Sequence, residues 1–221
     1  MNNIIYIIIL TFSISFAEAQ CDINRHNTSA DTKWMSCNEM ISPNPIRGSS
    51  HWIELSLSEF KAIGNIYLWN IADPDHLIDG ANQVAIDVSL DGITWTESAT
   101  ITLAMGESSG YYDGEEVVNL NQATAKYILI TALSNHGGDC YGLSELKIET
   151  VNFPCEDDTV IISDDPIATG VHVAAVSLQS DGGVSNSSEV YLYGEEEVIL
   201  LPGFMADASS TLLIDNQPCS N

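Results

Sequence analysis

A period-two alternation of apolar and polar residues limits this chain to a β fold. Residues 84–90 carry an apolar side chain at every second position, residues 53–57 do the same, and Asp91-Gly92 follows the first run as a strong turn signal. No stretch of ten or more residues has a convincing 3.6-residue period with caps, so the prediction is an all-β chain. Further strands are expected at residues 65–69, 99–103, 117–120, 126–132, 145–150, 160–162, 171–178, 190–193, 198–201 and 211–214.

The N-terminus predicts export. An apolar run at residues 4–16 is too short to span a bilayer but fits a signal peptide, with Ala17-Glu18-Ala19 as the cleavage site. We therefore expect residues 1–19 to be removed and the product to be secreted or held at the cell surface. No later segment is apolar enough to cross a membrane, so no transmembrane segment is expected in the mature chain.

The charge of the chain is strongly negative and unevenly distributed. Six Lys and Arg residues stand against 31 acids, for a formal net charge of −25. All six bases precede residue 150, so residues 155–221 contain acids without any Lys or Arg. Such a field repels nucleic acid and anionic membrane surfaces, whose binding depends on Lys and Arg. Nucleic acid is therefore excluded as a partner, and solubility is the simplest role of the acids.

The mature chain divides near residues 151–158, where Pro154 and Cys155 precede an acidic patch. Short strands with Gly, Asn and Asp turns favour a sandwich or jelly roll for residues 20–154. Residues 155–221 are expected to form a small C-terminal β module. A core of about 65 residues is marginal alone, so this module should lean on a disulfide or on its neighbour.

Several segments of the larger domain carry a family likeness. They are DTKW at 31–34, SHWIELSL at 50–57, DVSLDGITW at 87–95, and YILI at 127–130 followed by GLSELKI at 142–148. In this order they resemble the discoidin domains, also called coagulation-factor type C domains. The resemblance covers residues 24–150 and implies a galactose-binding-like jelly-roll sandwich, a scaffold for recognition of glycans, lipids or proteins. Ser56 and Lys126 replace the family's usual Asp and Arg, so its glycan-binding positions are not carried over.

The C-terminal module shows a second resemblance. The segment VILLPGF at 198–204 contains an L-x-P-G-F core, and Cys219 stands behind it. Residues 155–221 are similar to the three-coathanger stack module found at the C-terminal end of secreted bacterial proteins. The resemblance implies a surface or extracellular β module and implies no activity.

Two groups of oxygen-bearing side chains are candidates for calcium. Many galactose-binding-like domains hold a structural ion between the early loop and the closing strand, and Asn27, Asp31 and Glu145 match those places. The resemblance thus implies structural Ca²⁺ as the expected cofactor, with a plain surface role for Glu145 as the alternative. The second group is the 73–79 loop with its three Asp residues, which is interpreted as a solvated acidic loop.

Loop residues with amide, imidazole or phenol groups form the candidate ligand-binding set. Aromatic rings stack on the apolar faces of sugars, while Asn and His supply hydrogen bonds in a shallow site. The tryptophans Trp52, Trp69 and Trp95 are interpreted instead as strand packing. The candidate ligand contacts are Asn70, Tyr111, Tyr112, Asn135 and His136.

The cysteines are expected to form disulfides because the chain is exported and holds no C-x-x-C pair. The jelly roll that the resemblance implies brings the early and late loops together, so Cys37 is expected to pair with Cys140. Cys155 with Cys219 would then staple the C-terminal module and leave Cys21 odd. A Cys21–Cys155 pair is the alternative.

No catalytic machinery is recognisable. The segment at 106–110 fits the G-x-S-x-G expression of a hydrolase elbow, but the following Tyr-Tyr-Asp-Gly indicates a loop where the elbow needs a helix. A two-module chain of this size also has little room for a catalytic domain. The sequence therefore predicts a secreted, non-catalytic recognition module for carbohydrate at a cell surface or on polysaccharide. The alternative is a structural or adhesive surface protein that binds another protein or the cell envelope.

Overall fold

The protein is described by a computed structural model over residues 33–107, 115–216 and 219. The proposed signal peptide and Cys21 lie outside these residues. Within them the chain is built from strands, with two short 3-10 helices, η2 (Pro45–Arg47) and η3 (Leu77–Asp79). The all-β prediction is confirmed. No helix in this part of the chain has the length and apolarity that a membrane crossing requires.

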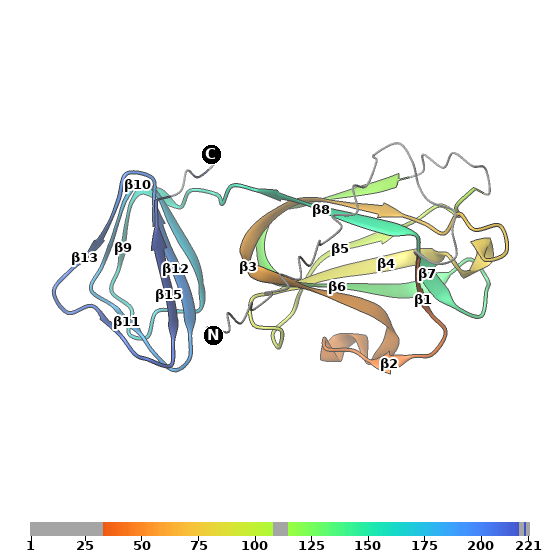
Figure 1. The fold of residues 1–221 in the computed structure, drawn as a ribbon, viewed down its shortest axis with the longest axis horizontal. Helices are drawn as coiled ribbons and strands as arrows, with labels where there is room; N and C mark the ends of the chain where they lie inside the picture. The colour runs from red at the N-terminus through yellow and green to blue at the C-terminus, as the bar shows by residue number, and fades with distance from the viewer. Residues whose placement is uncertain (1–32, 108–114, 217–218, 220–221) are drawn as a thin grey trace, which may run out of the picture.

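The larger module is an antiparallel assembly, drawn on the right of Figure 1. Its strands are β1 (Trp34–Ser36), β2 (Met40–Ile41), β3 (Ser49–Trp69), β4 (Ala81–Ser89), β5 (Thr96–Thr102), β6 (Glu115–Asn135), β7 (Tyr141–Leu143) and β8 (Glu145–Val151).

Two long strands, β3 and β6, run through both layers of a sandwich. Residues 51–56 of β3 pair with 127–132 of β6, and after register shifts residues 65–69 pair with 115–119. β4 pairs with the later half of β6, whereas β8 pairs with the later half of β3. Each long strand was expected as two separate strands. They are continuous because the chain bends at bulges without leaving the ladder.

The two layers share one hydrophobic core. The alternating residues Val84, Ile86 and Val88 of β4 are buried against Ile66 and Leu68 of β3 in a single cluster. The period-two pattern therefore identified the inward face correctly. Burial of this apolar surface is the main favourable term for a sandwich of this kind.

The outer face of the β4–β6 layer holds a buried ion pair. Asp87 is fully buried on β4, and Arg47 of η2 reaches it with Nε at 2.9 Å and Nη2 at 2.6 Å from the two carboxylate oxygens. The hydrogen bond to Asp87 raises the pKa of Arg47, despite the opposing effect of burial. Glu97 lies 2.7 Å from the same Nη2 but is half exposed. This two-pronged contact fastens the β2–η2 segment to the sheet.

The C-terminal module is a stack of parallel coils. Equivalent residues of successive coils lie side by side in parallel strands. Leu178 lies beside Val160 on one side and Val198 on the other, so successive coils are about 20 residues apart. Its strands are β9 (Asp157–Ile162), β10 (Gly170–Ser180), β11 (Gly183–Val184), β12 (Glu189–Gly194), β13 (Glu197–Leu200), β14 (Met205–Ala206) and β15 (Thr211–Asp215).

The two modules pack against each other through an apolar interface. The outward side chains Val173, Tyr191 and Tyr193 of the coils form one cluster with Phe60 of β3 and Phe153 of the connecting segment. The Phe60 and Tyr191 rings meet edge to face at 4.8 Å. Lys126 of β6 bridges the modules by pairing with Glu189 of β12 at 2.5 Å. The disulfide Cys155–Cys219 closes the small module, as expected.

The buried ion pair yields a stability prediction. Arg47→Met should lower the free energy of unfolding by about 3–5 kcal/mol, because it leaves the Asp87 carboxylate buried without its partner. Glu97→Gln removes only the exposed partner and should cost about 1 kcal/mol or less. Urea denaturation of the three proteins measures both effects. Equal midpoints for Arg47→Met and the parent would contradict this assignment.

Candidate functional site

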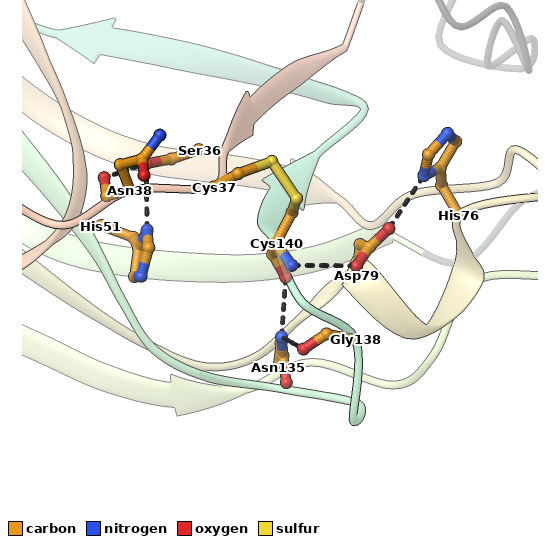
Figure 2. Close-up of a disulfide and its surroundings, with 9 residues drawn as sticks. All are labelled: Ser36, Cys37, Asn38, His51, His76, Asp79, Asn135, Gly138 and Cys140. Atoms are coloured by element: carbon orange, nitrogen blue, oxygen red, sulfur yellow. Dashed lines mark hydrogen bonds and ion pairs between the residues drawn. A yellow bond between two sulfur atoms is a disulfide. The ribbon is translucent and has the colours of Figure 1, made fainter.

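The loops at one end of the sandwich converge around a disulfide, as Figure 2 shows. β1 and β7 pair antiparallel with Ser36 opposite Tyr141, so the next residues, Cys37 and Cys140, face each other across the ladder and are bonded. The Cys37–Cys140 pairing expected from the discoidin resemblance is therefore present. It ties the early loop to the late loop over a separation of 103 residues.

The 135–140 loop is fixed from inside by Asn135. Its side-chain amide donates to the carbonyl oxygens of Gly138 at 2.8 Å and Cys140 at 2.7 Å. Its Oδ1 accepts from the Gly137 amide at 3.0 Å. The segment is therefore a tight loop fixed by the disulfide and by the Asn135 side chain. Asn135 was expected to contact a ligand, but these bonds assign its side chain to the loop itself.

The 70–80 loop is bound to the 135–140 loop through Asp79 and two backbone contacts. Asp79 Oδ1 accepts from the Cys140 amide at 3.0 Å, and Oδ2 lies 2.8 Å from His76 Nδ1. The Gly138 amide donates to the Ile78 carbonyl at 2.9 Å. Glycine is required at 138 because a Cβ there would overlap Asp79 Oδ1. The two loops consequently form one closely packed rim, here called the loop end.

The hydrogen bonds of the loop end determine the charge state of Asp79. Burial alone would raise the pKa of Asp79, but the hydrogen bonds from the His76 imidazole and the Cys140 and Asp139 amides outweigh it and lower the pKa. The carboxylate is therefore ionised at neutral pH, and it accepts from both loops at once.

Asn70 lies at the loop end but is not available to a ligand. It is 1% exposed, and its Nδ2 donates to the carbonyls of Ala81 and Ala104, both at 2.7 Å. Its Oδ1 accepts from the Ile71 amide. The prediction that Asn70 contacts a ligand is corrected: the amide connects three loops below the surface, and both its hydrogens are used.

His136 and His76 are the imidazoles of the loop end that reach solvent. His136 is partly exposed, and its Nε2 lies 3.5 Å from Asn70 Nδ2, at the outer limit of a hydrogen bond. The side chain of His76 is 41% exposed. His76 was not predicted as a candidate, although its place three residues before Asp79 was a signal. The other two candidates, Tyr111 and Tyr112, lie outside the described residues.

The acidic loop at residues 73–79 was expected to be solvated, but the structure differs from that expectation. Asp73 forms an ion pair of 2.5 Å with Lys33, whose side chain is only 7% exposed. The Lys33 hydrogen bond lowers the pKa of Asp73. Asp75 is the exposed acid of the loop. This interpretation is corrected because two of the three carboxylates have protein partners.

The calcium prediction is not decided by the described residues. Asn27 and Asp31 lie outside them, and Glu145 is half-buried at the start of β8, opposite Trp69. Glu145 also lines a small cavity with Trp34 and Ser144. Over residues 33–107 and 115–216 no three His, Cys, Asp or Glu side chains form a cluster that could hold a metal. Structural Ca²⁺ thus stays a prediction that depends on the early loop.

Comparisons with known proteins give fold-level likenesses only. No protein-family model matches the chain, and no curated protein matches it. Among solved structures, a CBM32 module from a family 31 glycoside hydrolase of Clostridium perfringens is 20% identical over 54% of this chain and 75% of its own, with a TM-score of 0.40. The C-terminal domain of a Bacteroides fragilis chitobiase is 18% identical over 57% and 75%, with a TM-score of 0.40.

A third structure, the CBM32 module of AlyQ in complex with 4,5-unsaturated mannuronic acid, is 22% identical over 56% of this chain and 79% of its own, with a TM-score of 0.40. These identities and TM-scores are too low to transfer a ligand or a site to this chain. The assignment of the small module to the three-coathanger family stays a prediction.

The Asp79 network predicts a pH dependence. Because the pKa of Asp79 is lower in the folded chain, its contribution to stability is complete above about pH 5 and is lost as the pH falls through the folded value. The free energy of unfolding should therefore differ between the parent and Asp79→Asn at pH 7, and the difference should shrink as the pH falls below the ordinary Asp pKa of about 3.9 toward the lower folded value. Asp75→Asn, an exposed acid of the same loop, is the control. A difference that stays constant from pH 7 to pH 3 would contradict the network.

Proposed function

We propose that the larger module is a secreted, non-catalytic carbohydrate-recognition module and that its ligand binds at the loop end. The observation that carries the proposal is the construction of this rim. His76 and His136 stand partly exposed on loops that a disulfide, Asp79 and Asn135 hold in one arrangement. A rim fixed before binding loses little conformational freedom when a ligand docks.

The chemistry of the rim suits sugar hydroxyls. The Nδ1 of His76 already bonds to Asp79, so its Nε2 is the nitrogen left for a ligand hydroxyl, and the partly exposed His136 ring adds a second imidazole. The exposed carboxylates of Asp75 and Asp139 add acceptors beside them. The resemblance of residues 31–34, 50–57, 87–95 and 142–148 to discoidin domains supports the same class of ligand.

The net charge of −25 narrows the ligand further. Uronic acids and sulfated glycans would approach a surface of their own sign, at a cost that falls only with added salt. We therefore propose neutral glycans, and structural Ca²⁺ as an addition that the early loop would have to supply.

A glycan array probed with the full chain, with and without Ca²⁺, tests the ligand class. We expect neutral glycans to bind and uronic or sulfated glycans to give no signal, because of the charge of the protein. Equal signals for every glycan, or binding confined to acidic glycans, would refute the proposal.

The position of the site is tested with histidine variants on the best neutral glycan. His136→Ala and the double variant with His76→Ala should weaken binding by about tenfold or more, as expected when hydrogen bonds to a ligand are lost. His172→Ala is the matched control, since His172 lies on β10 of the small module. Isothermal titration gives the affinities. Losses equal to that of the control would place the ligand elsewhere.

A further inference from the structure

A second cavity lies between the two modules. It has a volume of about 440 Å³, within the range of small-molecule sites, and such sites occur preferentially at domain interfaces. Leu90, Thr96 and Thr124 line it from the larger module and Thr169 from the small one. This junction pocket is remote from the loop end, because the small module packs on the side of the sandwich away from β1 and β7 (Figure 1).

The walls of the junction pocket are held by contacts between the modules. Lys126, two residues after Thr124, pairs with both carboxylate oxygens of Glu189 at 2.5 and 2.7 Å. The Glu189 amide donates to Thr169 Oγ1 at 3.3 Å. Burial, assisted by a hydrogen bond to Glu189, raises the pKa of Tyr191 to about 12, so its phenol stays protonated and donates to that carboxylate. Thr124 and Thr169 are thereby fixed on opposite walls.

Two hydroxyl groups of the lining are not used by the protein. In the part of the chain that the structure describes, the hydroxyls of Thr96 and Thr124 have no hydrogen-bond partner. Each can donate one hydrogen bond and accept others. Val88 and Leu90 add apolar surface between them. Hydroxyls beside aliphatic side chains match a ligand with both O–H groups and C–H faces.

The charged groups around the junction pocket disfavour anionic and cationic ligands. The carboxylate of Asp91 lines the pocket, and Glu189 stands behind Thr169, so an anion would be repelled. For a metal ion the lining offers a single carboxylate, that of Asp91, whose Oδ1 already accepts from Ser89 Oγ and the amides of Ile93 and Thr94. We propose that the junction pocket binds a short neutral saccharide. This second site goes beyond the loop end and does not depend on it.

The test is a titration of the isotopically labelled full chain with galactose, glucose, mannose, xylose, lactose and cellobiose, followed by backbone amide shifts. At least one sugar should shift the amides of residues 88–96, 124 and 169 together. Thr96→Val with Thr124→Val keeps the shape of the pocket but removes both hydroxyls. It should weaken that binding by about tenfold or more, as two lost hydrogen bonds imply.

Matched controls separate this site from the rest of the molecule. Thr102→Val, on the same strand as Thr96 but outside the pocket, should leave the affinity unchanged. His76→Ala with His136→Ala should leave the junction shifts unchanged even if the loop end binds nothing. The proposal is overturned if none of the six sugars shifts the junction amides at 10 mM or below. A sugar concentration of about 10 mM is enough to detect a millimolar dissociation constant. It is also overturned if Thr96→Val with Thr124→Val binds as tightly as Thr102→Val.

Discussion

The pairing of β3 with β6 is the constraint on which the rest of the larger module depends. The two strands contribute to both layers. β4 pairs with β6 and β8 pairs with β3, so both pairings depend on the register of the long ladder. A slip of one residue would turn every inward side chain outward. The same register sets where the strands end, and hence which loops meet. The loop end and the β6 bend beside the small module are thus two consequences of one ladder.

Local patterns were enough to identify the strands and their buried faces. They were not enough to show that β3 and β6 are continuous. The alternation breaks between Ser56 and Lys61, where the ladder shifts register, and Asn121-Gln122 resembles a turn because both residues have positive φ. A period-two pattern describes which face a side chain takes and carries no information on the partner strand. Continuity across a bulge is a tertiary property.

The disulfide of the candidate site could be predicted from the sequence. The ligand contacts could not, because they depend on the direction in which each side chain points. The disulfide Cys37–Cys140 followed from the loop order that the resemblance implied. Asn70 and Asn135 were chosen for amides that suit a sugar, yet the same amides satisfy buried carbonyls. The resemblance named a stack module, but the parallel pairing of its coils was not predicted, although Ser187-Ser188 and Ser209-Ser210 precede the paired residues Glu189 and Thr211 on successive coils. A repeat of about 20 residues with so few copies is difficult to detect in the sequence before the strand registers are known.

The scarcity of basic residues connects the fold to the choice of ligand. Every Lys and Arg in the described residues contacts a partner within the protein, and four of these five contacts are ion pairs with a carboxylate. The engaged pairs are Lys33 with Asp73, Arg47 with Asp87, Lys61 with Glu59, Lys126 with Glu189, and Lys147 over the Tyr67 ring. The pair Lys126–Glu189 also joins the modules, so the acidic coils are fixed beside the sandwich. Both proposed sites therefore belong to a chain of strongly negative net charge, where a neutral, hydroxyl-rich ligand loses least on approach.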